Sequence, residues 1–309
     1  MVRFIGKRIF YMLITLLVIA SFTFFLMKLL PGTPFNNEEK LTAEQKTMLY
    51  QKYGLDKPVP VQYLNYLGKL AKGDFGVSFQ QDNRSVTTII TERIGPSAVL
   101  GIEATIVGTI IGLFMGIIAA LRSNTWIDYW TSIVAVLGIS IPSFVFAGAL
   151  QYFVGVKLRW LPVAQWEGPE YHVLPTLSLA VFVVATVARF MRTEMLEVLG
   201  QDYITTAKSK GIANSVVVMK HTVRNALIPV VTILGPLAVN LITGTLIIEQ
   251  IFAVPGLGSQ FVSSIQQNDF PVIMGTTIFY STAFIIVILI VDILYGVIDP
   301  RIRVAGGKE

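Results

Sequence analysis

Six long apolar segments are separated by polar stretches of uneven length along this chain. They cover residues 9–30, 97–121, 127–156, 173–190, 227–252 and 272–298. A helix needs about 20 mostly apolar residues to cross the hydrocarbon core of a bilayer. The third segment is long enough to be tilted, or bent at Pro142. The pattern predicts an all-α, polytopic membrane protein with six transmembrane helices in a single domain, residues 1–309.

The composition supports lipid as the surrounding medium. The chain is 53% hydrophobic and 14% charged, whereas soluble domains carry about 25% charged residues. A net charge of +5 is typical of basic cytoplasmic loops in a membrane protein, so we expect no nucleic-acid binding. Cysteine is absent, which excludes disulfides and thiol catalysis. His172 and His221 lack a metal-binding spacing, so we expect no metal site.

The positions of the basic residues predict the orientation. If the N-terminus is cytoplasmic, thirteen Lys and Arg fall on the inside, and only Lys157 and Arg159 fall in the short outer loops. Cytoplasmic loops carry such an excess, so both termini are predicted to be cytoplasmic. The first apolar segment is longer than the core of a signal peptide, and no A-x-A-like site follows it. We therefore expect a retained helix.

Residues 31–95 are expected to form a small extracytoplasmic insertion. Thr42, with Gln45 three residues later, is a helix-capping pattern, and Gly54 is placed to end that helix. A second short amphipathic helix is predicted over 61–72, followed by a turn over 73–78. These helix signals argue against a plain surface linker.

The polar interruption over 192–226 is the most informative stretch. We predict one short helix over 202–214 and a second over 215–225, with Gly211 at the break. Ile204, Ala207 and Ile212 fall near one face, and the polar residues point elsewhere. A helix lying on the membrane surface would explain the pattern, as would a knob that enters a groove in a partner protein.

The same stretch carries the pattern of a known family. Importer permeases have Glu-Ala-Ala, three residues, Gly, a spacer, and Ile-x-Leu-Pro. This chain has Thr205-Thr206-Ala207, then Gly211, and after a longer spacer Ala226-Leu-Ile-Pro229. Both departures match the peptide and nickel branch, which reads D-Y-x-x-T-A-x-x-K-G and R-N-A-L-x-P. Matching positions here are Asp202-Tyr203, Thr206-Ala207, Lys210-Gly211 and Arg224-Asn-Ala-Leu-Ile-Pro229.

The chain therefore resembles bacterial ABC importer permeases of the oligopeptide, dipeptide and nickel branch, most nearly the B-type oligopeptide permease subunit. Other matching stretches lie at 53–58, 73–78, 249–258, 269–273 and 299–301, so the resemblance covers nearly the whole chain. It implies a multi-pass protein of a bacterial cell membrane that forms half of a translocation pathway. The implied ATPase-coupling loop contains Asp202, Tyr203, Thr205, Thr206, Ala207, Lys208, Lys210, Gly211 and Ile212.

The resemblance also implies partners. They are a homologous second permease, two ATPase subunits and an extracytoplasmic peptide-binding protein, with lipid around them. ATP and Mg²⁺ would bind the ATPase subunits, because this chain has no G-x-x-x-x-G-K-[ST] motif. We therefore expect no cofactor on this chain and no enzyme activity of its own.

Polar groups inside apolar segments are candidates for the translocation pathway or its gate, because an ionisable group in lipid is costly. The candidates inside the segments are Glu103, Asn240, Thr243 and Glu249, and Pro255 and Gly256 of the loop that follows the fifth segment are added as candidates for gating. Glu103 at a helix interface and Glu249 as a brace of the loop over 255–258 are the structural alternatives. The stripe Gly108, Gly112 and Gly116 is typical of close helix packing rather than of a substrate site.

Three other functions stay open on the residues. A nickel or metal-chelate importer, or a dipeptide importer, would share this subunit pattern, because cargo selection rests largely with the binding protein. A self-sufficient channel or secondary transporter would need neither ATP nor partners, and the internal repeats of many secondary transporters are not visible here. An intramembrane enzyme would need a catalytic pair at matching depth, and both histidines lie outside or at the edges of the apolar segments.

Overall fold

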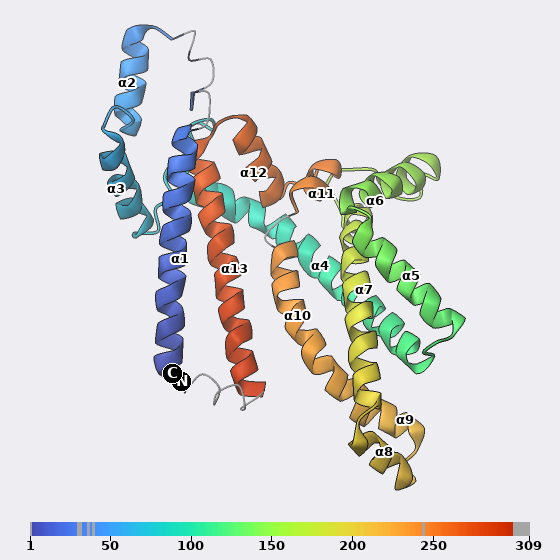
Figure 1. Ribbon diagram of the computed structural model, residues 1–309. Helices are drawn as coiled ribbons and strands as arrows, with labels where there is room; N and C mark the ends of the chain where they lie inside the picture. Colours follow the sequence, from blue (N-terminus) through green and yellow to red (C-terminus); the bar gives the residue numbers. More distant parts are fainter. Residues whose placement is uncertain (1, 30–32, 36–37, 39–40, 243–244, 299–309) are drawn as a thin grey trace. The chain divides into compact units, whose positions relative to one another are not determined.

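The computed structural model describes residues 2–29, 33–35, 38, 41–242 and 245–298, and the regular elements within them are helices joined by turns and loops (Figure 1). Within these residues the only β-type pairing is an isolated bridge between Val77 and Ser85. The all-α prediction is confirmed. The chain divides into two compact units, one formed by residues 1–95 with 256–289 and the other by 96–255 with 290–309.

Among the residues that the structure describes, five stretches are long and apolar enough to cross a membrane, namely Gly6–Leu29, Val86–Leu121, Pro169–Leu199, Asn214–Ile251 and Phe270–Ile290. Trp126–Ser140 and Ser143–Lys157 meet the same criterion only when taken together, and they are bent by 101° at the break between them, which is the geometry of a broken span or of a re-entrant loop. The third apolar segment is therefore bent rather than merely tilted. Pro142 lacks an N–H, and Ile141 before it has an extended backbone (φ −81°, ψ 121°), so an α-helix cannot run through.

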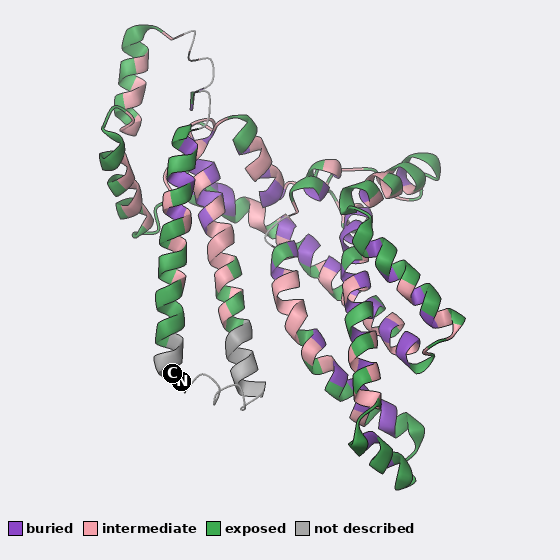
Figure 2. Ribbon diagram, in the orientation of Figure 1, coloured by how far each residue is buried: buried purple, intermediate pink, exposed green. Residues whose placement is uncertain are grey.

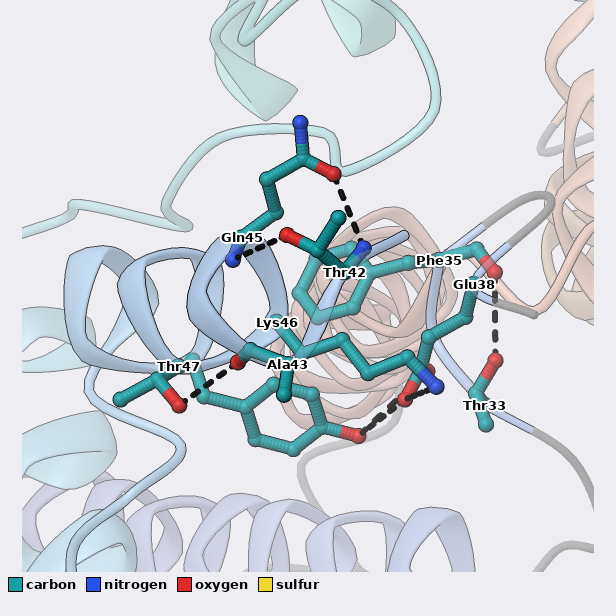
Figure 3. Close-up of polar contacts among 9 residues, drawn as sticks. Thr33, Phe35, Glu38, Thr42, Ala43, Gln45, Lys46 and Thr47 are labelled. Carbon is teal, nitrogen blue, oxygen red and sulfur yellow. Dashed lines mark hydrogen bonds and ion pairs between the residues drawn. The ribbon is translucent and has the colours of Figure 1, made fainter. Parts of the chain in front are cut away.

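The first unit contains α1 (Val2–Leu29), α2 (Ala43–Tyr53), α3 (Val59–Leu70), the first turns of α4 (Val86–Leu121), α12 (Leu257–Gln266) and most of α13 (Phe270–Ile298). The predicted cap of α2 is confirmed. Thr42 Oγ1 accepts from Gln45 N at 3.3 Å, and Gln45 Oε1 accepts from Thr42 N at 2.9 Å (Figure 3). Gly54 ends the helix at φ 68°.

Aromatic side chains hold α3 against α1. Phe24 stacks on Tyr66 with ring centroids 5.6 Å apart, and Tyr63 O–H is 2.6 Å from Ser21 Oγ. Lys28 Nζ donates to Gln62 Oε1 at 2.5 Å. Two boundaries differ from the prediction: α3 covers 59–70 rather than 61–72, and α4 begins at Val86 rather than Ser97. The last part of the stretch assigned to the outer insertion is therefore helical and continues through Pro96.

Asp269 ties the turn after α3 to the start of α13. It is buried, its Oδ1 accepts from Phe79 N at 3.0 Å, and its Oδ2 accepts from the Ser78 hydroxyl. Burial raises the pKa of this carboxyl, and the hydrogen bonds from Ser78 and nearby backbone N–H groups oppose the shift. The net direction is upward, so the folded chain holds a proton more tightly than the unfolded chain.

The raised pKa of Asp269 predicts how the stability of the protein depends on pH. Because the folded-state pKa of Asp269 is raised, its contribution to stability grows as the pH falls through that pKa and is lost as the pH rises. Thermal unfolding in mild detergent, followed across the acidic range, should show this slope in the wild type. Asp269→Asn should flatten it, because the amide does not titrate. An unchanged slope in the variant would assign the pH dependence to other groups.

The second unit is built around α7 (Pro169–Leu199). Around it lie the rest of α4, α5 (Trp126–Ser140), α6 (Ser143–Leu150), the π-helix η2 (Gln151–Lys157), α8 (Asp202–Ser209), α9 (Asn214–Val216), the π-helix η3 (Val217–Val223), α10 (Arg224–Ile242) and α11 (Leu246–Ile251). Leu174, Val183, Val187, Met191 and Met195 form the buried face of α7. The helix is thus longer than the predicted apolar segment over 173–190 and runs from Pro169 to Leu199.

The glycine stripe on α4 packs against this face. A Cβ at Gly108 would lie 2.5 Å from Val183 Cβ, one at Gly112 would lie 2.8 Å from Val187 Cβ, and one at Gly116 would lie 2.6 Å from the Ala188 carbonyl oxygen. Real Cβ atoms do not approach other atoms so closely. The glycines therefore permit close contact of two helices, as the spacing predicted.

Candidate functional site

The polar interruption forms a compact helical projection at one end of α7 and α10 (Figure 1). Helix α7 ends at Leu199, Gln201 has an extended backbone, and α8 then runs from Asp202 to Ser209. Asp202 lies in its first turn and Lys208 in its last, which suits the helix dipole at both ends. Gly211 then reverses the chain with φ 74°. The predicted break at Gly211 is present, but the helix ends at Ser209 rather than at Asn214.

The apolar side of α8 faces the chain's own helices. Ile204 and Ala207 are buried against Val217, and Val198 of α7 packs on the same cluster. Ile212, predicted near the same face, is 37% exposed. Most of this end of the second unit is exposed in Figure 2. The exposed positions of the segment are Asp202, Tyr203, Thr205, Thr206, Lys208, Ser209, Lys210 and Gly211.

The surface offered to a partner is therefore polar, and its charged groups are one carboxylate and two lysines. The sequence pattern showed that α8 is amphipathic but did not show which face a partner would meet. Burial of Ile204 and Ala207 removes apolar surface from water and so holds α8 in place, while the polar side of the helix, with Lys208 and Lys210 close by, stays exposed.

A second attachment joins α8 to the following span. Asn225 Nδ2 donates to Tyr203 Oη at 3.0 Å and to the His221 carbonyl oxygen at 2.8 Å. The predicted separate helix over 215–225 is wrong, because α9, η3 and α10 follow one another without a break from Asn214 to Ile242. Helix α8 is thus attached both to α7 and to the helix that enters the fifth span.

The π-helix η3 lies between this projection and the span. Thr222 Oγ1 donates to the Val217 carbonyl oxygen at 3.3 Å, five residues back. π-Helical turns inside α-helices are rare and often lie at functional positions. Nothing in the sequence pattern indicated one here.

The pathway candidates do not form one cluster. Glu103 Oε1 lies 3.1 Å from His172 Nδ1, and Thr176 Oγ1 donates to Glu103 Oε2 at 3.0 Å. The His172 ring stacks on Trp166 at 3.7 Å. Glu103 is thus held at the interface of α4 and α7, as its structural alternative predicts.

Glu249 is fully buried within α11. Its Oε1 accepts from Ser97 Oγ at 2.8 Å and from Thr245 N at 3.2 Å, so it joins α4 to α11 and caps the start of α11. Val254 N donates to the Glu249 carbonyl oxygen at 2.8 Å, which closes the turn that leads to Pro255. Gly256 precedes α12 as its N-cap residue.

Asn240 lines a cavity of about 800 Å³ in the second unit. The cavity lies beside the break at Pro142 and is walled mainly by aliphatic side chains of α5, α7, α10 and α11, with Ser178 and Thr245 among its few polar neighbours. Thr243, predicted near Asn240, lies outside the described residues. Neither Glu103 nor Glu249 lines this cavity.

A charged pair that the sequence reasoning missed lies at the other end of α5. Arg192 Nε and Nη2 donate to the two carboxylate oxygens of Asp128 at 2.5 and 2.7 Å. Asp128 is the third residue of α5, and Arg192 is on α7. An acid near a helix start is visible in a sequence, but its partner lies 64 residues away and no local pattern points to it.

No group of three or more metal-binding side chains occurs in the part of the chain that the structure describes. The comparisons with known proteins point to transport instead. The family model for the binding-protein-dependent transport system inner membrane component matches residues 112–304, and the model for the N-terminal part of such membrane components matches residues 1–101. The chain belongs to this family. The docking-type segment over 192–226 lies inside the longer match.

Relatives of this inner membrane component extend over nearly its full length. It is 46% identical to the dipeptide transport system permease protein DppB of Bacillus subtilis over 98% of both chains. It is 42% identical to the oligopeptide transport system permease protein OppB of Haemophilus influenzae, over 98% of this chain and 100% of the relative. The inner membrane component is therefore a multi-pass transport protein of the bacterial inner membrane rather than an enzyme.

A solved structure shares the fold. The crystal structure of an amino acid ABC transporter with histidines aligns with a TM-score of 0.52 at 17% identity, over 70% of this chain and 94% of that chain. At this identity the likeness concerns the arrangement of helices alone.

Proposed function

We propose that this chain is one of two membrane subunits of an ATP-driven peptide importer. It forms half of the translocation pathway, and α8 docks on an ATPase subunit. The observation that carries the proposal is the construction of α8: an exposed polar helix held by a buried apolar face and by the Asn225–Tyr203 hydrogen bond. A helix attached to two spans can pass a movement of its partner to both.

ATP hydrolysis is assigned to the partners. The chain has no phosphate-binding loop motif, so ATP and Mg²⁺ belong on the ATPase subunits. The remaining partners are a homologous second permease and an extracytoplasmic binding protein that delivers cargo. Closure of the ATPases would move α8 and switch the pathway between inward and outward access.

Within the pathway, Asn240 is the candidate with the best support, because it is exposed and lines a cavity. Glu103 and Glu249 are assigned a structural role in helix packing, since their carboxylates form hydrogen bonds to side chains of neighbouring helices. Pro255 and Gly256 form the turn between α11 and α12 and are assigned to its geometry.

The proposed cargo class is peptides. The names of relatives cover dipeptide and oligopeptide systems, and the dipeptide name belongs to the relative with the higher identity of the two described above. Oligopeptide cargo and its dipeptide alternative are therefore both kept in the proposal. A nickel or metal-chelate cargo is the second candidate, and an uptake assay separates the three.

The test uses the transporter purified through a tag on this chain from its own host and reconstituted in vesicles. We expect a second permease, ATPase subunits and a binding protein to copurify, and labelled peptides to accumulate only with ATP and the binding protein. Dipeptide, pentapeptide and nickel-chelate uptake are compared in the same vesicles. Transport by this chain alone, without ATP, would refute the proposal and indicate a channel or secondary transporter.

A further inference from the structure

Asp128 and Arg192 form a buried two-pronged ion pair between α5 and α7. The Asp128 side chain is 3% exposed and the Arg192 side chain 29%. Besides the two bonds from Arg192, Asp128 Oδ2 accepts from Asn124 N at 3.0 Å, just before α5 begins. A buried carboxylate is costly unless it is paired and hydrogen-bonded, and this one has three donors.

The pair is the directional contact of its interface. Farther along the interface, α5 approaches α7 closely at a glycine: a Cβ at Gly138 would lie 2.9 Å from Ala185 Cβ, and Thr131 and Ala135 are the other buried residues of α5. Apolar contacts resist separation but do not specify a direction, whereas a two-pronged Arg–carboxylate contact fixes both position and rotation. The first turn of α5 is therefore fixed to α7 mainly by these two side chains.

The pair also lies close to the point where α8 is attached. Val198 of α7 packs against Ile204 and Ala207, and Arg192 lies six residues earlier on the same uninterrupted helix. At its opposite end, α5 stops at Ser140, beside the break at Pro142 and the cavity that Asn240 lines. A continuous series of contacts thus runs from α8 through α7 and the ion pair to α5 and the cavity.

We infer that Asp128 and Arg192 are positioning residues that carry the movement of α8 to α5 and so to the cavity. The inference rests on the proposed docking role of α8. Without the ion pair, α7 would follow the ATPase subunit while α5 no longer moved with it. ATP hydrolysis would then continue with little transport.

The experiment measures peptide uptake and ATP hydrolysis in the same vesicles, with the complete transporter. Asp128→Asn is the main variant, because the amide oxygen can still accept from Asn124 N while the charge that holds Arg192 is removed. We expect the complex to assemble, basal ATP hydrolysis to persist, and uptake per ATP to fall about tenfold, within the usual range of coupling between sites. Arg189→Gln, an exposed change on the same helix, is the matched control and should leave the ratio unchanged.

Two further variants separate coupling from stability. Arg192→Gln leaves Asp128 buried without its counter-ion, so it lowers stability as well as coupling. The double variant Asp128→Asn with Arg192→Gln has no unpaired buried charge. If the pair carries movement, the double variant is assembled and stable but as uncoupled as Asp128→Asn. If the pair only stabilises the fold, the double variant recovers normal uptake per ATP, and the inference is overturned.

The wild-type control distinguishes failure of this inference from failure of the proposed function. A wild-type transporter without ATP-driven uptake would reject the proposed function and, with it, the inference. A wild type that transports normally, together with an Asp128→Asn variant that transports the same amount per ATP, would reject the ion-pair role alone.

Discussion

Gly211→Asp is expected to abolish ATP-driven uptake while the chain still inserts into the membrane and assembles. A Cβ at Gly211 would meet nothing within 4 Å, so a side chain has room there. Its φ of 74° is left-handed, which costs a non-glycine residue roughly 1 kcal/mol, and Asp and Asn tolerate it best. The added carboxylate lies on the exposed surface that includes Lys208 and Lys210 and changes its charge.

Gly211→Asn is the matched control. It has the same shape and nearly the same backbone strain as Gly211→Asp, and it differs in charge alone. Uptake in vesicles, with copurification of the ATPase subunits as a second readout, should be retained with Asn and lost with Asp. Equal loss with both would assign the effect to backbone strain, and normal coupled uptake with both would mean that this surface does not dock on the ATPase.

A companion change tests how α8 is held. Ala207 is buried against Val217 and Val198, so Ala207→Arg must push α8 away from its support. Uptake should again be abolished, whereas Ala207→Ser, which is nearly the same size, should transport. Loss of uptake with Arg and retention with Ser would show that α8 must pack against Val217 and Val198 for ATP-driven uptake to occur.

The second large effect is expected at the glycine stripe of α4. Gly112→Ala places a Cβ 2.8 Å from Val187 Cβ and 2.9 Å from the Val184 carbonyl oxygen, and Gly108→Ala and Gly116→Ala make similar clashes with α7. Overpacking of this kind costs about 1–3 kcal/mol at each site. We expect a lower melting temperature and less assembled transporter for each variant, and the three together should prevent assembly.

Gly148→Ala is the control for this series. Gly148 lies in α6, and a Cβ there would meet nothing within 4 Å. Alanine favours a helix over glycine by up to about 1 kcal/mol, so this variant should be at least as stable as the wild type. Thermal unfolding of the detergent-solubilised complex measures all four variants. A Gly112→Ala variant as stable as Gly148→Ala would contradict the close packing of α4 on α7.

Much of the architecture was already determined by local pattern. Apolar length predicted the spans, the Thr42–Gln45 spacing predicted the cap of α2, and Gly211 marked the turn after α8. The glycine spacing on α4 predicted a packing face. Each of these signals depends on residues that are near one another in the chain. The local structure that it predicts can therefore be read from one sequence.

The helix boundaries were less predictable. Apolarity ends where lipid ends, but hydrogen bonding continues, so α4 starts at Val86 and α7 continues to Leu199 beyond their apolar segments. The same reason explains the helix over 215–225, which was predicted to be separate and instead joins α10 through η3. An α-helix can continue past the edge of the lipid, because its backbone hydrogen bonds form within the helix on both sides of that edge.

By itself, then, the sequence determined the class of protein, the long apolar segments, the position of the amphipathic segment that contains α8 and, through its motifs, the family. Only the tertiary structure decided which face of α8 is free, that Glu103 and Glu249 bond between helices, and that Asp128 meets Arg192. These contacts join residues far apart in the chain. Their strength comes from burial and from directional bonds that exist only after the helices have packed, and no local spacing encodes them.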